Sequence, residues 1–399
     1  MALGWVDVRI CMMLSHAHDR ACQSEKMKIA NDAIIRSQQL LTQVTEMISE
    51  MQCHAGQLDR ESEFPVADFA SLRAVGALSA VVPERFGGLG FGTEPAGALG
   101  LLDLLCLIGR GNLAVGRVFE GHVNAVGLIA LYGTKEQLAK ASQDAREGHL
   151  FAIWNTEPPE GLRVVGTTLS GSKCFCSAVG YATRAVVTAK TENGETRMLL
   201  LSLEGGQRTE RMEFRLQGMR AAVTGRITFD GFRISSDAFV GRPGDYTKEP
   251  AFSAGAWRTS AVTLGGLEAL IEEARMQLVK RGRSGDPHQQ ARMGRMIIAQ
   301  ETARMWCRRA ALIAEGEHAQ PEEKTAFVNL GRIAIETATM DTMRLAQRSL
   351  GLAAFLQPSP IERLMRDLGT YLRQPAPDEA LTEAASWFFE HGGLGQLAS

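Results

Sequence analysis

Apolar residues recur with the spacing of an amphipathic helix in the first and the last third of the chain. The clearest stripes are Ile34, Ile35, Leu40, Leu41, Val44 and Ile48, then Phe69, Leu72, Val75 and Leu78, and later Leu264, Leu267, Ile271, Ala274 and Leu278. Helices are also predicted over residues 101–131, 291–313 and 325–350, and Thr134 is the predicted N-cap of another. The pattern therefore predicts a helical region at each end of the chain.

Between about residues 150 and 240 the pattern is different. Short runs of β-branched and aromatic residues, at 184–190, 198–203 and 227–229, are separated by Gly, Asn and Asp, as is typical of strands. Apolar and polar residues alternate from Cys174 to Ala178, which predicts a half-buried strand, and residues 169–172 are predicted to form a tight turn before it. We expect a small β-domain, either a barrel or a sandwich.

Together these patterns predict an α+β multidomain fold with an N-terminal helical domain, a small central β-domain and a C-terminal four-helix bundle. The predicted bounds are 29–149, 150–248 and 249–399. Residues 1–28 lack the charged start and the cleavage site of a signal peptide. For them we expect a flexible N-terminal extension, or an upstream start codon with Met27 as the natural first residue.

The composition is that of an ordinary soluble globular protein, with 45% apolar and 22% charged residues. A net charge of −2 gives no reason to expect nucleic acid or a membrane surface as a partner, and no apolar run approaches the length of a transmembrane helix. The seven cysteines form no CxxC pair, so we predict no metal site and expect reduced thiols in the cytoplasm. No GxGxxG segment indicates a Rossmann nucleotide site.

The predicted strand at 174–178 carries the first indication of chemistry. It offers an aromatic ring, Phe175, and a small hydroxyl, Ser177. A flat heterocyclic cofactor needs a ring to stack on and short donors for its rim atoms. The same pattern is also typical of a hairpin strand that fills a core, so the strand alone does not decide between the two interpretations.

Several motifs stand in an order and spacing that resemble the acyl-CoA dehydrogenase superfamily over roughly residues 55–372. They are the segments 83–90, 132–137, 156–158, 169–178 and 218–220, then Arg281 with Gly285 and Pro287, Gln347 with Gly351, and Glu362 and Arg363 with Arg366 and Asp367. The resemblance implies FAD as the cofactor and α,β-dehydrogenation of an acyl-CoA or another small organic substrate. It also implies a separate electron acceptor.

The resemblance further implies which residues hold FAD. Asn155 and Thr156 would bond to the flavin rim, Phe175 would stack beside the isoalloxazine, and Ser177 would reach its N5/O4 side. In the family, residues matching Arg281, Gln347 and Gly351 contact the pyrophosphate and adenosine portions across a subunit boundary, which implies a homodimer or homotetramer. A bidentate cation on phosphate fits the role of the arginine.

The catalytic base is where the chain departs from the family. The reaction needs a carboxylate near the α-carbon, but Pro375 and Trp257 occupy the two positions where the family keeps its Glu. A shifted loop can instead bring Asp378 or Glu379 to the site, and these are our candidate catalytic residues.

Two other functions stay open because of that departure. Flavin-dependent monooxygenases that share this fold lack the Glu and use reduced flavin and oxygen. A binding or assembly protein that keeps the fold without turnover is the remaining alternative.

Overall fold

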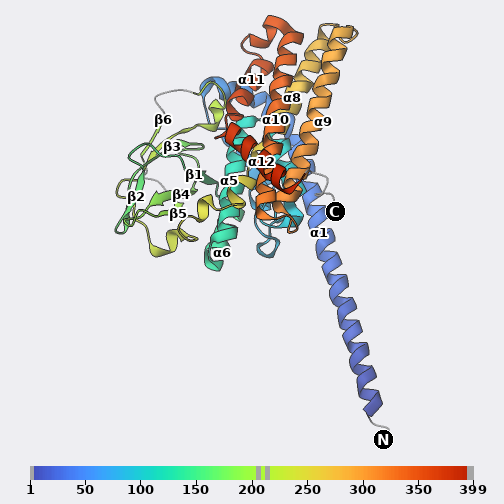
Figure 1. Ribbon diagram of the computed structural model, residues 1–399, viewed down its shortest axis with the longest axis vertical. Helices are drawn as coiled ribbons and strands as arrows, with labels where there is room; N and C mark the ends of the chain where they lie inside the picture. Colours follow the sequence, from blue (N-terminus) through green and yellow to red (C-terminus); the bar gives the residue numbers. More distant parts are fainter. Residues whose placement is uncertain (1–3, 204–207, 212–215, 393–399) are drawn as a thin grey trace.

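The computed structural model describes residues 4–203, 208–211 and 216–392, and it consists of helices, a central sheet and further helices (Figure 1). This order confirms the predicted fold class, with helical regions on either side of a β-region in the sequence. In Figure 1 the sheet lies to one side of the helices. The domain bounds remain a prediction. Within the described residues, no helix is long and apolar enough to cross a membrane.

The N-terminal helices surround an apolar core. They are α1 (Gly4–Glu61), α2 (Val66–Ala74), α3 (Ala77–Ala80), α4 (Ala98–Gly111), α5 (Leu113–Tyr132) and α6 (Lys135–Arg146). Thr134 caps α6 as predicted, because its hydroxyl accepts a hydrogen bond from the backbone N–H of Gln137. Leu40, Val44 and Ile48 of α1 are buried, as their spacing predicts.

Helix α1 begins far from the core. Figure 1 shows its N-terminal part extending away from the rest of the molecule. Ile34 and Ile35, which we expect on the buried stripe, are 54% and 50% exposed, because few residues cover the helix there. The helix runs through residues 4–28, so this stretch is helical, and its flexibility stays a prediction.

The described residues of the central region form one eight-stranded mixed sheet. Its strands are β1 (Phe151–Trp154), β2 (Leu162–Val165), β3 (Thr168–Cys176), β4 (Arg184–Lys190), β5 (Thr196–Ser202), β6 (Arg208–Arg211), β7 (Gly225–Thr228) and β8 (Phe239–Val240). Strand order is β6-β7-β3-β2-β4-β5-β8, and β1 pairs with β4 in parallel. Strand β3 connects the two halves, because it pairs with β2 and with β7.

The prediction of a turn at residues 169–172 is wrong. These residues belong to β3, where Leu169 pairs with Val164 and Gly171 pairs with Leu162. The hairpin turn lies earlier, at residues 166–167, where Gly166 has a φ of +57°. Glycine reaches this left-handed region at little cost, so the chain reverses there and the serines that follow are left in the strand.

The C-terminal helices include α7 (Ala251–Ala254), α8 (Trp257–Lys280), α9 (Pro287–Glu315), α10 (Pro321–Leu350), α11 (Pro360–Tyr371) and α12 (Pro377–His391). The predicted apolar stripe of α8 is entirely buried. Helix α8 crosses α4 of the N-terminal region so closely that a Cβ on Gly265 would lie 2.0 Å from the carbonyl oxygen of Cys106. The two helical regions therefore share one tightly packed core.

A buried histidine fixes the boundary between helices and sheet. His122 of α5 is fully buried, its Nε2 lies 2.8 Å from the carbonyl oxygen of Leu78, and its Nδ1 accepts the N–H of Phe151 at 3.1 Å. The ring is therefore the neutral tautomer with its proton on Nε2. Burial lowers the pKa of His122 from 6.5 to about 4.

This lowered pKa predicts a loss of stability in acid. Between pH 6.5 and about 4, His122 is protonated in the unfolded chain but stays neutral in the folded chain. The free energy of unfolding is therefore at its full value above pH 6.5 and decreases as the pH falls below it. We expect this difference in protonation of His122 to lower the free energy of unfolding by about 3 kcal/mol between pH 6.5 and pH 4. His122→Gln, which does not titrate, should therefore lose less stability than the wild type between pH 7 and pH 4 in urea unfolding. His318→Gln, at an exposed position, is the control; a His122→Gln profile that parallels the wild type would contradict the prediction.

Candidate active site

One cavity of about 770 Å³ lies where the sheet meets the C-terminal helices. Its walls come from α5, β3, the segment around the short helix η3 (Arg220–Ala222), α10, the short helix η6 (Gly351–Phe355) and α11. Its lining includes Arg117, Phe175, Ser177, Met219, Ala222, Thr224, Gln347, Glu362, Arg366, Thr370, Tyr371, Arg373 and Gln374. A cavity of this size is typical of sites that hold cofactors and small substrates.

Two of the predicted cofactor residues, Phe175 and Ser177, line this cavity together. Phe175 is 43% exposed although it belongs to the central strand β3. The carbonyl oxygen of Ser177 accepts a hydrogen bond from the indole N–H of buried Trp154 at 3.0 Å, which fixes the backbone there. The Ser177 hydroxyl lies 3.5 Å from that of Thr224, across the cavity wall.

Backbone strain gathers around the cavity. Phe175 and Met219, which line it, have φ values of +55° and +59°. Ala178 follows Ser177 with a φ of +58°, and Val223, between lining residues Ala222 and Thr224, has a φ of +43°. Residues other than glycine adopt this region only when the surrounding structure enforces it, and such residues cluster at functional sites. The strain therefore supports a functional role for this cavity.

A buried lysine holds the loop that contains Asn155 and Thr156. Lys173 of β3 is fully buried, and its ammonium donates to Glu157 Oε2 at 2.7 Å, Thr188 Oγ1 at 2.9 Å and the carbonyl oxygen of Asn155 at 3.0 Å. All three protons of the ammonium therefore have partners. Burial lowers the pKa of Lys173, and Glu157 opposes that shift. Asn155 and Thr156 are exposed and do not line the cavity themselves.

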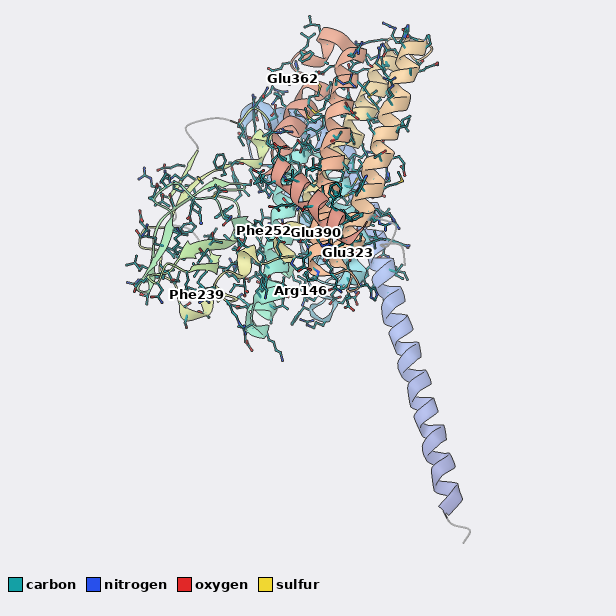
Figure 2. All side chains as sticks on the ribbon, viewed as in Figure 1. Arg146, Phe239, Phe252, Glu323, Glu362 and Glu390 are labelled. Atoms are coloured by element: carbon teal, nitrogen blue, oxygen red, sulfur yellow. The ribbon has the colours of Figure 1, made fainter. Side chains whose placement is uncertain are left out.

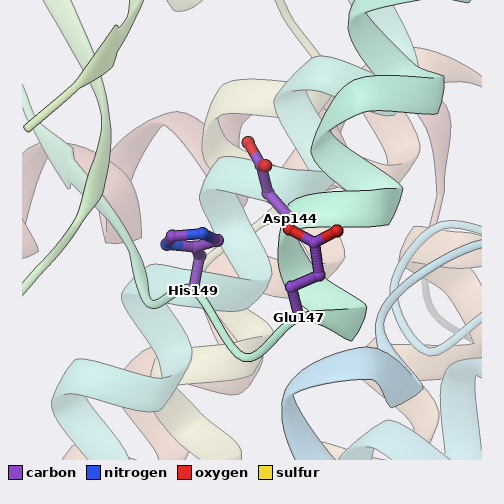
Figure 3. A group of neighbouring side chains, drawn as sticks. All are labelled: Asp144, Glu147 and His149. Carbon is purple, nitrogen blue, oxygen red and sulfur yellow. The ribbon is translucent and has the colours of Figure 1, made fainter. Parts of the chain in front are cut away.

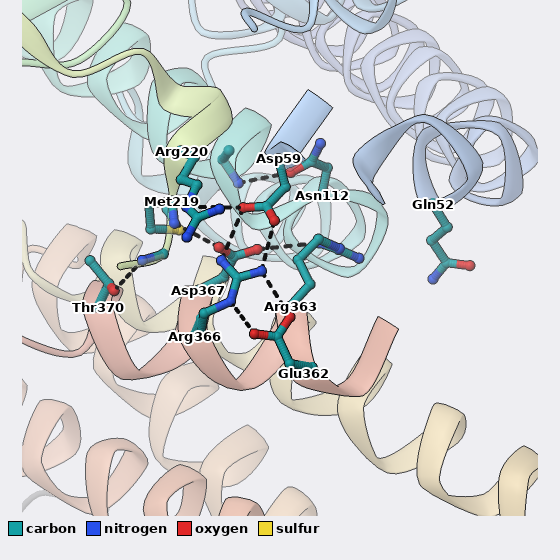
Figure 4. Close-up of polar contacts among 12 residues, drawn as sticks. Gln52, Asp59, Asn112, Met219, Arg220, Glu362, Arg363, Arg366, Asp367 and Thr370 are labelled. Carbon is teal, nitrogen blue, oxygen red and sulfur yellow. Dashed lines mark hydrogen bonds and ion pairs between the residues drawn. The ribbon is translucent and has the colours of Figure 1, made fainter. Parts of the chain in front are cut away.

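A charge network fixes the opposite wall (Figure 4). The Arg366 guanidinium donates to both oxygens of Asp59, at 3.1 and 2.7 Å, and to both oxygens of Glu362, at 2.5 and 2.9 Å. Next to it, the buried Asp367 carboxylate accepts the backbone N–H of Met219 at 2.6 Å and pairs with Arg363 at 3.2 Å. Helix α11, which carries Glu362 (Figure 2), is thereby tied to α1 and to the segment before η3.

Of the residues predicted to contact FAD across a subunit boundary, only some line the cavity. Gln347 lines the cavity, whereas Arg281 and Gly351 do not. Arg281 is exposed and donates to the carbonyl oxygen of Leu350 at 3.4 Å, so it lies beside the end of α10. Gly351 has φ +62° and ψ −141°, a conformation open essentially to glycine alone. Apart from its chain neighbours, no atom of the described residues lies within 4 Å of where its Cβ would stand. The surface here is open to a partner.

The structure does not bring the candidate bases to the cavity. Asp378 and Glu379 are exposed in the first turn of α12 and are absent from the cavity lining. The turn before them is held by Arg332, which donates to the carbonyl oxygen of Pro375 at 2.6 Å, and by Pro375 and Pro377, which restrict the backbone. Trp257, at the other position where a base is expected, is buried, and its indole N–H donates to Glu315 at 3.0 Å.

Sequence reasoning missed the cavity residues Arg117 and Tyr371 and the supporting residues Lys173 and Asp59. Asp59 carries no local signal, because its partner Arg366 lies 307 positions away. Arg117 pairs with Glu120 three residues further along the same helix, but such an i,i+3 pair is common on helices and does not indicate a site. Lys173 could have been predicted, because a lysine within a half-buried strand needs a carboxylate partner once it is buried.

A group of Asp144, Glu147 and His149 has the composition of a metal site (Figure 3). The Asp144 carboxylate, however, already accepts from Arg184 and from Lys140, each at 2.7 Å. Two cations on one carboxylate oppose the binding of a third. The group is therefore explained as an ion-pair cluster at the end of α6.

Two family models match this chain. The acyl-CoA dehydrogenase N-terminal domain matches residues 36–148, and the acyl-CoA dehydrogenase C-terminal domain matches residues 245–372. Together they cover more than half of the sequence, so the chain belongs to the acyl-CoA dehydrogenase family, as its motifs predict.

Individual relatives carry different activities. Acryloyl-CoA reductase (NADH) of Anaerotignum propionicum is 25% identical over 86% of this chain and 92% of its own. Glutaryl-coenzyme A dehydrogenase in its glutaryl-CoA complex has a TM-score of 0.76 at 21% identity, covering 89% of this chain and 95% of that one. Dibenzothiophene monooxygenase from Paenibacillus sp. A11-2 has a TM-score of 0.75 at 21% identity, covering 88% and 97%. These structures share the fold, and they do not distinguish between the reactions.

The family homologues are flavoproteins, and the described residues fit a flavin. The half-exposed Phe175 ring offers a stacking surface, the Ser177 hydroxyl offers a donor, and the cavity is large enough for a flat ring beside a substrate.

The support for the Asn155 loop can be tested by removing its lysine. Lys173→Met takes the cation from Glu157 and the donor from Asn155, and we expect it to lower the free energy of unfolding by about 2–3 kcal/mol. Lys190→Met, at the exposed end of β4, is the matched control and should change stability by less than about 0.5 kcal/mol. Equal stabilities of the two variants in urea unfolding would show that Lys173 does not hold the loop.

Proposed function

We propose that the chain is an FAD-dependent oxidoreductase that dehydrogenates an acyl thioester between Cα and Cβ. The observation that carries the proposal is the cavity itself, which joins a strained, ring-presenting strand of the sheet to α10 and α11 in a chain that matches the family on both sides of the sheet. A bound flavin supplies the acceptor for the hydride that leaves Cβ.

The chain's own residues position the reactants. In this proposal Phe175 stacks beside the isoalloxazine and Ser177 donates to its N5/O4 side, while Lys173 fixes the loop from which Asn155 and Thr156 would reach the rim. The Arg366 network holds α11 against the segment before η3, so this wall of the cavity keeps its position beside the reactants.

FAD, rather than a shorter flavin, is proposed because residues matching the family's pyrophosphate and adenosine contacts lie near one another. Arg281 reaches the end of α10, where Gln347 and Gly351 also lie. In the proposed homodimer or homotetramer this surface contacts FAD held by a neighbouring subunit.

The proton from Cα needs a base. Among the described lining residues, Glu362 is the one carboxylate, and Arg366 already engages both of its oxygens. Asp378 and Glu379 remain our candidates, and either can act only if the turn at residues 373–377 moves so that the start of α12 faces the cavity.

A second function, a flavin-dependent monooxygenase, is favoured by one specific observation. The described cavity lining contains no unpaired carboxylate, and a reaction of reduced flavin with oxygen needs no base at Cα. The fold is shared with a monooxygenase as closely as with a dehydrogenase.

Flavin absorbance separates the two. Anaerobic addition of acyl-CoA thioesters of short, branched and long chains to the oxidised, FAD-loaded protein is expected to bleach the flavin bands. Asp378→Asn or Glu379→Gln should slow bleaching by at least ~10²-fold, because one of them accepts the proton.

Glu383→Gln, at an exposed position of the same helix, is the control and should bleach at the wild-type rate. No bleaching by any thioester, together with oxygenated product from the reduced flavin, would replace the dehydrogenase by the monooxygenase.

A further inference from the structure

Arg117 of α5 lines the cavity with hydrogen-bond donors to spare. Its Nη1 donates to Glu120 Oε2 at 2.7 Å, and this is the bond that joins its guanidinium to the described part of the chain. The side chain is 30% exposed although its helix is largely buried. A guanidinium has five N–H donors in a planar fork, so several of them are open to the cavity.

Glu120 holds this arginine in place. Its carboxylate is buried and also accepts from Asn124 Nδ2 at 2.5 Å and from Thr259 Oγ1 at 3.3 Å. Asn124 is oriented in turn by Arg258, which donates to its Oδ1 at 3.0 Å. Because these bonds occupy both carboxylate oxygens, Glu120 fixes the direction of Arg117, and its charge raises the pKa of Arg117.

Arg117 differs from the other cations of the cavity wall. Arg366 uses all three guanidinium nitrogens on Asp59, Glu362 and a backbone carbonyl. Arg373 pairs with Glu336 and is 58% exposed, so it lies toward solvent. Three arginines and one carboxylate therefore face the described cavity, and Arg117 is the one whose orientation is fixed while its donors remain available.

From this arrangement we propose that Arg117 selects acyl thioesters whose chain ends in a hydrogen-bond-accepting oxygen, such as a carboxylate or a hydroxyl. The inference deepens the proposed function and rests on it. The methylene part of such a chain lies along the apolar lining residues Met343, Ala354 and Met365, and its terminal oxygen accepts from the open nitrogens of Arg117. Plain acyl chains leave these donors without a partner once water is displaced, which disfavours their binding.

Isothermal titration of the FAD-loaded protein with matched thioesters tests the selection. Butyryl-, valeryl- and hexanoyl-CoA are compared with the dicarboxylic succinyl-, glutaryl- and adipyl-CoA and with the ω-hydroxyacyl thioesters of equal length. In at least one length the terminal-oxygen thioester should bind about tenfold or more tighter than the plain one. Tight binding of the dicarboxylic member alone identifies an anion, whereas equal gains with the hydroxyl member identify a neutral acceptor.

Variants then assign the selection to Arg117. In Arg117→Met, the affinities for the terminal-oxygen thioester and for the plain thioester should differ by no more than about threefold. Arg117→Lys keeps a charge for Glu120 but lacks the planar fork, so its affinity ratio should lie between those of the wild type and Arg117→Met. Arg275→Met is the matched control, because Arg275 also pairs with a glutamate three positions away but is 52% exposed and does not line the cavity; it should keep the wild-type ratio. The inference is overturned if plain thioesters bind as well as the others, if Arg117→Lys and Arg117→Met both keep the ratio, or if these variants lose FAD, since Arg117 would then be a flavin contact. Equal binding of all thioesters leaves the proposed function standing, whereas binding of none removes both.

Discussion

The cavity depends on one charge network, in which Arg366 is bound by Asp59 and Glu362. Asp59 and Arg366 are 307 positions apart in sequence, so their bond joins the end of α1 to α11 and, through the carbonyl oxygen of Gln217, to the segment before η3. Buried charges gain little net stability when paired, but removal of one partner strands the other at a cost of several kcal/mol. The network therefore specifies how these three segments meet, and their meeting forms one wall of the cavity.

The opposite wall is fixed by different means. Lys173 donates a hydrogen bond to the carbonyl oxygen of Asn155, and Trp154 donates one to that of Ser177. These contacts hold strand β3 in place despite the positive φ at Phe175. The turn that contains Pro375 is held by one hydrogen bond, from Arg332 to the carbonyl oxygen of Pro375, which must break before Asp378 or Glu379 can approach the cavity. The described lining thus presents Phe175 and Ser177 to the cavity, while its one carboxylate, Glu362, is engaged by Arg366.

Many elements of this fold could be predicted from local sequence patterns. Helical stripes, the cap at Thr134 and the run at residues 184–190 correspond to observed elements because each depends on neighbours in sequence. The prediction of a turn at residues 169–172 was wrong because serine and glycine occur both in turns and in strands. The chain reverses at Gly166 instead, and residues 169–172 pair within β3. Phe175, Ser177 and Gln347, which were predicted from their motifs, line the cavity. Arg117 pairs with Glu120 in its own helix, but the contact of Glu120 with Thr259 of α8 is tertiary and could not be predicted from local sequence.

The central claim is that a flavin lies against Phe175, and fluorescence titration of the flavin-free protein with FAD tests it most directly. Phe175→Ala should raise the dissociation constant about fivefold or more, since a lost ring stack costs about 1 kcal/mol. Phe389→Ala, which removes a ring that is 92% exposed on α12, should leave it unchanged. An unaltered dissociation constant in a folded Phe175→Ala protein would contradict this account of the site.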